Sequence, residues 1–328
     1  MHQLLQSFSS LLYLAYFINA VDVNPPQLRF SEPGPHQVIP KDFPDPGFLK
    51  VSADWYAFST NAYNKKVQVA KSSDFENWTV LNTDALAGLG PWESPLDHWA
   101  PDIIMRDDGR LVLYYSGRLK ESPRYHCVAA AVSEGQDPAG PYHPLEEPFA
   151  CHMEKGGSID PAGFLDKDAS RWLVYKVDGN NIGNGGDCGN SIPPLAPTPI
   201  YLQKVAGDAV TKIGDPITIL DRDESDGPLI EAPSLILSSE GVYFLFYSSH
   251  CWTAPAYDVR YATSRSITGP YLKAAEPLIK SGDYGLKAPG GATVANNGER
   301  MLFHANCPAG RCMYAANIEI KGETARIV

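Results

Sequence analysis

The chain has 328 residues, of which 44% are hydrophobic and 20% are charged, a composition typical of an ordinary folded domain. Its formal net charge of −11 argues against nucleic acid or an anionic membrane as a partner, because both attract a basic surface. The composition therefore favours a neutral or weakly charged ligand.

The first residues have the character of a secretion signal. Residues 4–22 are rich in leucine and carry no charge before Asp22, and Ala20 offers a small residue at which a signal peptidase could cut. We therefore predict a signal peptide over residues 1–20 and a proline-rich N-terminal extension over residues 21–40. An uncleaved membrane anchor is the alternative, because the positive charge that usually opens a signal is weak here.

The chain contains six cysteines, an even number that fits an oxidising compartment. There is no CxxC pair, so the spacing does not indicate a metal site. Cys307 and Cys312 are close enough in sequence to close a small hairpin loop, and we predict a disulfide between them. We accordingly expect a secreted, extracellular protein that has no membrane contact once the signal is removed.

A short motif that contains proline returns five times after residue 40. Its prolines stand at positions 46, 101, 161, 233 and 289, at intervals of 55 to 72 residues. A motif that returns at intervals of this length indicates a repeat architecture. The five copies read Phe43-Pro44-Asp45-Pro46, Trp99-Ala100-Pro101-Asp102, Ile159-Asp160-Pro161-Ala162, Glu231-Ala232-Pro233-Ser234 and Lys287-Ala288-Pro289-Gly290.

Each motif is followed by a similar series of strand-like segments. After the motif strand comes a turn, such as the Asp-Gly and Asn-Gly turns at residues 107–109 and 296–298, and then an apolar, aromatic run that favours a buried strand. A third strand-like segment follows in every unit, and no helical periodicity competes. Five units of about four strands each predict an all-β protein, a five-bladed β-propeller over residues 41–328. The apolar runs are residues 55–58, 111–115, 172–175, 242–247 and 301–304.

Three of the motifs carry an acid beside the proline. Asp45 and Asp160 stand directly before it, and Glu231 stands one residue earlier. The first strand of each propeller blade lines the central channel, so we expect these three side chains to face one cavity. Each acid alone is more simply a turn former or a solvated strand end, but their equivalent places in one repeat favour a site. Converging carboxyl groups have pKa values that are driven apart, which is what acid–base hydrolysis of a glycosidic bond requires.

The ordered set of motifs resembles glycoside hydrolase family 43, over the chain from about residue 42 to its end. The resemblance implies an inverting hydrolase that cleaves α-L-arabinofuranosyl or β-D-xylosyl linkages of plant cell-wall polysaccharide or oligosaccharide, with no required cofactor. By position it makes Asp45 the general base, Glu231 the general acid, and Asp160 the residue that raises the pKa of the acid and orients it. An inverting pair stands roughly 6.5–9.5 Å apart to admit a water molecule.

The same resemblance assigns further residues. Trp99 lies next to His98 at the head of the second motif, and both are expected to bind substrate, with the tryptophan ring as a platform for the sugar; a buried blade tryptophan is the alternative. His304 ends the last apolar run, where related enzymes hold a calcium ion or a water molecule near the axis. A structural calcium site at His304 is one hypothesis, and a hydrogen-bonded core histidine is the other.

Two loops differ from the rest. Residues 180–190 are rich in glycine and asparagine but lack the strand-to-helix context of a phosphate-binding loop, so we expect them to fold over the site, tied down through Cys188. Residues 221–227 are acidic, but their spacing does not match an EF-hand calcium loop. We expect a solvated acidic loop there, before the strand that carries Glu231.

The fifth motif departs from the family pattern. Many members have a Gly-Pro-Gly-His sequence where this chain has Ala288-Pro289-Gly290-Gly291. This departure does not affect the three acids. It leaves three activities open, exo-acting arabinofuranosidase, endo-arabinanase and β-xylosidase, of which we favour the first. The related sucrose- and fructan-cleaving propellers are disfavoured, because their Asn-Asp-Pro-Asn and Arg-Asp-Pro motifs are absent. A propeller that binds carbohydrate or protein without catalysis is the alternative from another class.

Overall fold

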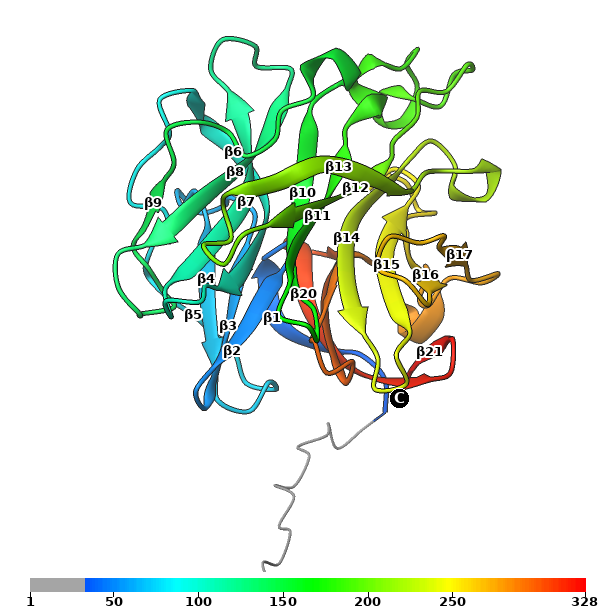
Figure 1. The fold of residues 1–328 in the computed structure, drawn as a ribbon. Helices are drawn as coiled ribbons and strands as arrows, with labels where there is room; N and C mark the ends of the chain where they lie inside the picture. Colours follow the sequence, from blue (N-terminus) through cyan, green and yellow to red (C-terminus); the bar gives the residue numbers. More distant parts are fainter. Residues whose placement is uncertain (1–32) are drawn as a thin grey trace, which may run out of the picture.

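The computed structural model describes residues 33–328. The signal peptide expected over residues 1–20 lies outside the described residues. Within residues 33–328 the strands form five antiparallel sheets of four or five strands each (Figure 1). The innermost strands of successive sheets contact one another, and that of the last sheet contacts that of the first. The predicted five-bladed β-propeller is therefore confirmed.

The blades follow one another along the chain. Blade 1 contains β2 (Gly47–Val51), β3 (Asp54–Ser59), β4 (Gln68–Ser72) and β5 (Thr79–Val80). Blade 2 contains β6 (Glu93–Met105), β7 (Leu111–Leu119), β8 (His126–Ser133) and β9 (Tyr142–Pro144). Blade 3 contains β10 (Ser158–Leu165), β11 (Arg171–Val177), β12 (Ile200–Val205) and β13 (Lys212–Leu220). Blade 4 contains β14 (Ile230–Leu237), β15 (Tyr243–Ser249), β16 (Asp258–Ser264) and β17 (Leu272–Lys273). Blade 5 contains β18 (Gly290–Val294), β19 (Arg300–Cys307), β20 (Gly310–Lys321), β21 (Thr324–Ile327) and β1 (His36–Asp42).

The helical segments of residues 33–328 are short 3₁₀ turns in the connections between strands. They are η1 (Met153–Lys155), η2 (Gly179–Ile182), η3 (Asp187–Gly189), η4 (Glu224–Asp226) and η5 (Asp283–Gly285). In this part of the chain we find no helix with the length and apolar character that a membrane crossing requires.

Strand β1 closes the ring of blades. It pairs antiparallel with β20, with His36 opposite Ala315, so that the first strand in the sequence completes the last blade. This pairing places the start of the propeller at His36, inside the extension expected over residues 21–40. The physical reason is that β20 needs a partner on its open side, and the segment just before the first motif supplies it.

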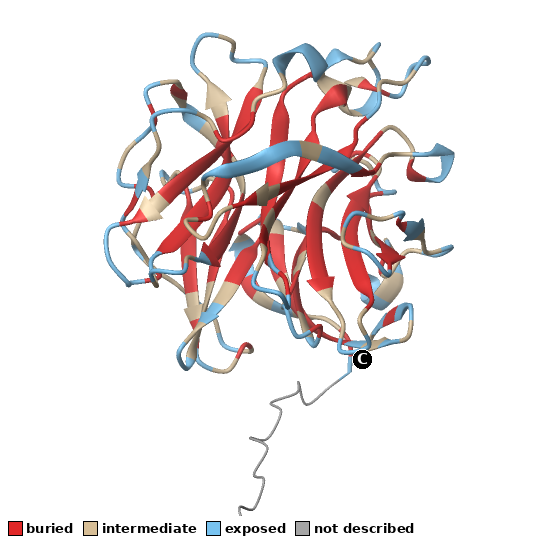
Figure 2. Cartoon of the chain, viewed as in Figure 1, coloured by how far each residue is buried: buried red, intermediate tan, exposed pale blue. Residues whose placement is uncertain are grey.

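The hydrophobic core is divided among the contacts between blades. Each of five clusters of buried side chains joins two neighbouring blades, for example through Phe58 of blade 1 and Tyr142 of blade 2, whose ring centroids lie 6.1 Å apart. Figure 2 shows the inner strands as largely buried, whereas β13 at the outer edge of blade 3 is mostly exposed. Packing between blades therefore leaves the centre of the ring free for polar side chains.

The proline motifs all lie at the inner strands, and their backbone is unusual. The residue before each proline has a positive φ, between 42° and 56°, which non-glycine residues rarely adopt. In β6, β10 and β14 the strand register shifts at this place, which marks a β-bulge; in β18 the shift lies beyond the motif proline, between Gly290 and Thr293. Bulges bend a strand and redirect side chains, and they are common beside active sites. The five residues are Asp45, Ala100, Asp160, Ala232 and Ala288.

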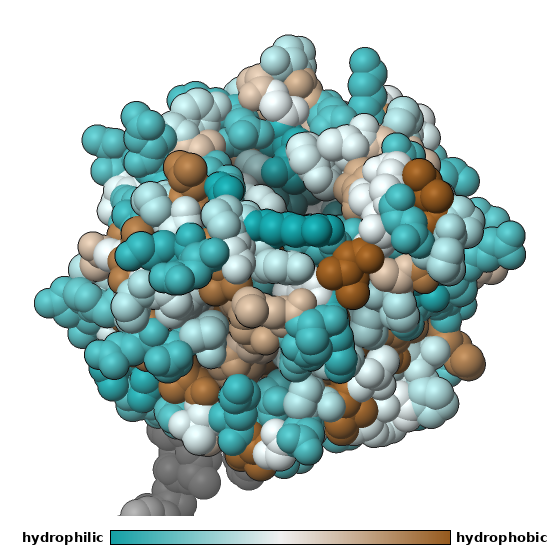
Figure 3. Space-filling view, turned by 90° about the horizontal axis from the view of Figure 1, so that it is seen from above, coloured by the Kyte–Doolittle hydropathy of each residue, from teal (hydrophilic) through white to brown (hydrophobic). Residues whose placement is uncertain are grey.

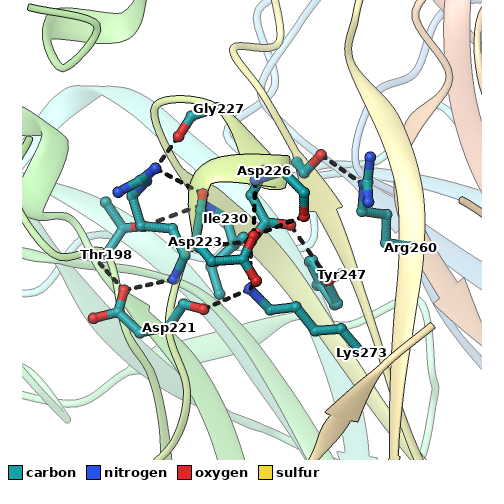
Figure 4. A network of polar contacts seen from close by, with 12 residues as sticks. Thr198, Asp221, Asp223, Asp226, Gly227, Ile230, Tyr247, Arg260 and Lys273 are labelled. Atoms are coloured by element: carbon teal, nitrogen blue, oxygen red, sulfur yellow. Dashed lines mark hydrogen bonds and ion pairs between the residues drawn. The ribbon is translucent and has the colours of Figure 1, made fainter. Parts of the chain in front are cut away.

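The acidic loop at residues 221–227 is more ordered and less solvated than predicted. Asp226 is buried, and its carboxylate contacts the ammonium group of Lys273 and lies 3.4 Å from the hydroxyl of Tyr247 (Figure 4). Lys273 Nζ also lies 2.8 Å from Asp223 Oδ2. A single cation from β17 thus draws two carboxylates together, which anchors the loop just before β14.

The closure of blade 5 by β1 can be tested by mutation. Ile39→Ala is expected to lower the free energy of unfolding by about 2–5 kcal/mol, because Ile39 is buried in the cluster between blades 5 and 1 and its loss leaves a cavity. Urea denaturation measures this difference. Lys41→Ala, an exposed position on the same strand, is the control and is expected to change stability by less than about 0.5 kcal/mol. Equal effects would contradict closure by β1.

Candidate active site

A cavity of about 480 Å³ is lined by all three acids of the motifs and by residues of every blade. Figure 3, which views the molecule from above, shows a hollow near the centre of this face with mainly hydrophilic side chains around it. Its volume is in the range of small-ligand sites in proteins. The structure therefore brings Asp45, Asp160 and Glu231 together in one place that a ligand can enter.

Asp45 is held in the charged form by its neighbours. Its carboxylate accepts a hydrogen bond from Thr60 Oγ1 at 2.8 Å and lies 3.4 Å from Arg311 Nη1. Burial alone would raise the pKa of Asp45, but the charge of Arg311 and the contacts with His304 and Thr60 outweigh burial and hold the pKa well below its usual value. Asp45 is therefore a carboxylate at neutral pH, the form that can accept a proton.

The pKa of Asp160 is shifted in the opposite direction, upward. Burial, followed by the negative charge of Glu231, raises the pKa of Asp160 well above its usual value, although the cation of Lys176 opposes this. Its Oδ2 atom accepts a hydrogen bond from the backbone N–H of Ala232 at 3.0 Å. Because Ala232 directly follows Glu231, this bond joins the two acids across blades 3 and 4. The pair is thus suited to hold a proton beside the cavity.

Glu231 lies between a cation and a phenol. Its Oε2 atom lies 3.0 Å from Lys176 Nζ, and Tyr257 donates a hydrogen bond to Oε1 at 2.9 Å. Lys176, on β11, is fully buried and also lies 3.0 Å from Asp178 Oδ1. Burial alone would lower the pKa of Lys176, but the charges of Asp178, Glu231 and Asp160 outweigh it and raise the pKa. Lys176 therefore remains a cation in contact with Glu231.

The two residues expected to bind substrate are placed differently. Trp99 lines the cavity, and its ring stacks on that of His126 with 3.6 Å between centroids. His98 is fully buried, does not line the cavity, and has its Nε2 atom 3.3 Å from Glu93 Oε2. The prediction for His98 as a substrate contact is therefore wrong, because neighbouring residues on β6 point to opposite sides of the strand.

His304 supports Asp45 and does not form a metal centre. Its Nδ1 atom accepts a hydrogen bond from the backbone N–H of Asp45 at 3.1 Å, and burial lowers the pKa of His304, which favours the neutral ring. The described part of the chain has no cluster of three or more His, Cys, Asp or Glu side chains that could hold a metal ion. Calcium takes about six to eight oxygen ligands, so the residues present do not fit the calcium site expected at His304.

The glycine-rich loop of blade 3 covers part of the cavity, as predicted. Asn180 and Asn181 of this loop line the cavity wall. Cys188 is bonded to Cys251 of blade 4, so the loop is tied across two blades. This confirms the expected role of Cys188 and places Trp252, the residue after Cys251, at the rim.

Sequence reasoning missed the cations and two of the aromatic residues of the site. Arg311 lies in the hairpin that the predicted disulfide Cys307–Cys312 closes, and its guanidinium lies 4.7 Å from the ring centroid of Trp252. Tyr257 and Lys176 contact Glu231 directly. One signal was available for Lys176, because a lysine inside an apolar strand is almost never buried without a charged partner.

The model of the family described as glycosyl hydrolases family 43 matches residues 35–323. The chain belongs to glycosyl hydrolase family 43. It is therefore a glycosidase, an enzyme that hydrolyses O-glycosyl bonds, and the resemblance noted in the sequence is confirmed.

Several relatives of this family 43 enzyme are known. The extracellular endo-α-(1→5)-L-arabinanase 1 of Bacillus subtilis (strain 168) is 28% identical over 278 residues, which cover 80% of this chain and 79% of the relative. Xylosidase/arabinosidase 43B of Humicola insolens is 27% identical over 257 residues, 75% of this chain and 42% of the relative. A solved structure of a thermostable family-43 glycoside hydrolase has a TM-score of 0.73 at 23% identity, covering 87% of this chain and 92% of that one. A native arabinanase from Bacillus subtilis has a TM-score of 0.66 at 25% identity, covering 87% and 96%.

The raised pKa of Asp160 leads to a prediction about the stability of this family 43 enzyme. Because its pKa is raised in the folded protein, Asp160 stays protonated in the folded state when it already ionises in the unfolded state, above about pH 4. The wild type therefore loses stability as the pH rises above about 4. Asp160→Asn removes this loss and keeps an oxygen that can accept from Ala232 N–H. We therefore expect the free energy of unfolding of the variant, relative to wild type, to be near zero at about pH 4 and to exceed about 1 kcal/mol at pH 7.

Urea denaturation of both proteins at the two pH values measures this difference. Asp54→Asn, which removes an acid of blade 1 that pairs with Lys71 outside the cavity, is the control and is not expected to gain stability as the pH rises. An advantage of Asp160→Asn that does not grow between the two pH values would contradict the raised pKa.

Proposed function

We propose that the protein is a secreted, inverting glycosidase that cleaves α-L-arabinofuranosyl linkages of plant cell-wall polysaccharides and oligosaccharides, with β-D-xylosyl linkages as the second candidate. The observation that carries the proposal is the presence, in one cavity, of a carboxylate held ionised at Asp45 and a proton-retaining pair of acids at Asp160 and Glu231. Inverting hydrolysis needs a carboxylate base and a carboxylic acid on opposite sides of the scissile bond.

In the proposed reaction Asp45 takes a proton from a water molecule as that water attacks the anomeric carbon. Glu231 gives its proton to the leaving glycosidic oxygen, so the bond to the leaving group breaks as the bond to water forms. Asp45 ends protonated and Glu231 ends as a carboxylate, and exchange of one proton with solvent restores both. Asp160 orients Glu231 through the N–H of Ala232. The carboxyl groups suffice for this chemistry, so no cofactor is needed.

The wall of the cavity supports a carbohydrate ligand. Trp99 offers an aromatic ring, and the side-chain oxygen of Asn180, which has no hydrogen-bond partner within the protein, suits a sugar hydroxyl. We favour exo action on a terminal arabinofuranosyl residue; the loop of blade 3, tied by the Cys188–Cys251 disulfide, forms one wall of the cavity. The names of the relatives support arabinan or xylan as substrates, and that of the Bacillus subtilis arabinanase is the reason to test endo action as well.

Secretion is part of the proposal. Three disulfides join all six cysteines, and disulfides persist in oxidising compartments. Three of the arabinanase relatives are named extracellular. The signal peptide expected over residues 1–20 is the route by which the chain would leave the cell.

The experiment that tests the function is a screen of the purified protein against p-nitrophenyl α-L-arabinofuranoside, p-nitrophenyl β-D-xyloside and linear arabinan. Turnover of the first with slow release of arabinose from arabinan supports the exo-acting arabinofuranosidase. Release of short oligosaccharides from arabinan indicates endo action, and turnover of the xyloside alone indicates a xylosidase. Binding of these sugars without any turnover would overturn the enzymatic proposal in favour of a carbohydrate-binding propeller.

Asp45→Asn is expected to lower kcat on the best of these substrates by at least about 100-fold, because an amide cannot accept the proton of the attacking water. Steady-state kinetics measure the loss, and a thermal melt checks that the variant folds. Asp54→Asn is the matched control on the same blade and is expected to keep wild-type kcat, since Asp54 pairs with Lys71 outside the cavity. Full activity of Asp45→Asn would remove Asp45 as the base.

Glu231→Ala is expected to abolish hydrolysis of arabinan while the fold stays intact. Glu231→Gln provides a second variant that keeps an oxygen to accept the hydrogen bond of Tyr257 but has no acidic proton to transfer to the leaving oxygen, and we expect it to lose at least about 100-fold on the same polysaccharide. Reducing-sugar release measures both. Unchanged turnover of arabinan by either variant would show that another group is the acid.

A further inference from the structure

Lys176 is a fully buried lysine whose presence the acid–base pair alone does not explain. It lies at 0% exposure on β11 and its ammonium group reaches the cavity wall. Lysine is almost never fully buried unless it is paired, and a buried ion pair contributes little net stability compared with apolar side chains of similar volume. The lysine therefore calls for a functional reason, which its contacts supply.

The contacts of Lys176 are set by strand pairing. Lys176 lies opposite Ile159 in the register of β10 and β11, next to Asp160. From there Nζ lies 3.0 Å from Glu231 Oε2 and 3.0 Å from Asp178 Oδ1. Glu231 thus has its Oε2 atom beside a permanent cation, while its Oε1 atom accepts from Tyr257.

The charges around Glu231 come from several elements. Asp160 of β10 interacts electrostatically with Glu231, Asp178 just after β11 lies beside Lys176, and Asp45 just before β2 lines the same cavity. His304 of β19 faces it as a ring whose pKa is lowered by burial, and Tyr257 faces it as a phenol whose pKa is raised by burial. Lys176 is the cation in direct contact with the carboxyl group. Asp178 lies 3.0 Å from Lys176 Nζ and balances part of the charge of that cation.

We propose that Lys176 is a positioning residue that promotes proton release from Glu231 to the leaving oxygen, an inference that rests on the proposed role of Glu231 as general acid. In the general-acid role, Glu231 ends the step as a carboxylate once its proton has moved to the leaving oxygen. The ammonium group at 3.0 Å interacts more strongly with that carboxylate than with the neutral acid. An interaction that strengthens in the transition state raises kcat.

This role has a signature that a purely structural lysine would not have. An unactivated sugar alcohol leaves only if it is protonated, whereas p-nitrophenolate leaves with little help from an acid. Loss of Lys176 should therefore slow cleavage of a disaccharide far more than cleavage of an aryl glycoside. Without the nearby cation, the acid also keeps its proton to higher pH, so the alkaline limb of the pH profile moves upward.

The test compares Lys176→Met with wild type on p-nitrophenyl α-L-arabinofuranoside and on the corresponding arabinobiose, or on the xylose equivalents if the enzyme prefers xylose. We expect kcat to fall about 100-fold on the disaccharide and less than about 5-fold on the aryl glycoside, with the alkaline limb of kcat/KM shifted to higher pH. Lys176→Arg keeps the charge and is expected to restore most of the disaccharide activity. Equal losses on both substrates with an unmoved alkaline limb would overturn the proposal.

Lys273→Met is the matched control. Lys273 also joins two carboxylates, Asp223 and Asp226, but it lies outside the cavity (Figure 4). Its loss is expected to lower stability while leaving the ratio of the two kcat values and the alkaline limb unchanged. If Lys176→Met fails to fold, Asp178→Asn tests the same idea in the opposite direction, because it leaves the cation less balanced and is expected to move the alkaline limb to lower pH. An unmoved limb in Asp178→Asn would count against the proposal.

Glu231→Gln separates failure of this inference from failure of the proposed function. If Glu231 is the acid, its variant loses far more activity on the disaccharide than on the aryl glycoside. That result together with equal losses in Lys176→Met would overturn the role of Lys176 alone. Equal losses in Glu231→Gln itself would overturn Glu231 as the acid, and the role of Lys176 with it.

Discussion

The residue before each motif proline is held in a left-handed backbone conformation, and the site depends on this constraint. Proline has no N–H to donate to the strand ladder, and in β6, β10 and β14 a bulge beside the proline redirects the side chain that precedes it. Where that residue is aspartate, at positions 45 and 160, the cavity receives a carboxylate. Where it is alanine, as at Ala232, the space stays open, and the neighbouring Glu231 reaches the cavity with its longer side chain.

The backbone of the same turns links each acid to a neighbouring blade through hydrogen bonds. The backbone N–H of Asp45 donates to His304 of blade 5, and the N–H of Asp160 donates to Ser116 of blade 2, so each acid is anchored by the preceding blade. The N–H of Ala232 is anchored by the carboxylate of Asp160 itself. Asp160 therefore has a structural and an electrostatic role at once, and its unfavourable burial is part of what gives the site an acid at neutral pH.

The sequence predicted the elements that repeat and missed the contacts that do not. The five-fold return of proline placed the inner strands and, with them, the three acids. Closure of blade 5 by β1 had no local signal, because its partner β20 lies at the other end of the chain. The burial of His98 follows from strand alternation next to a bulge. Lys176 is 55 residues from Glu231, and such a long-range contact can be seen only when the blades are assembled.

In the proposed reaction Asp45 activates water while Glu231 protonates the leaving oxygen across one cavity. Proton NMR of the first-formed sugar, recorded before the anomers equilibrate, distinguishes this reaction from its alternative. If water attacks from the side of Asp45, the released sugar has the anomeric configuration opposite to that of the substrate. Release of a sugar with the configuration of the substrate would instead make Asp45 a nucleophile and rule out its role as the base.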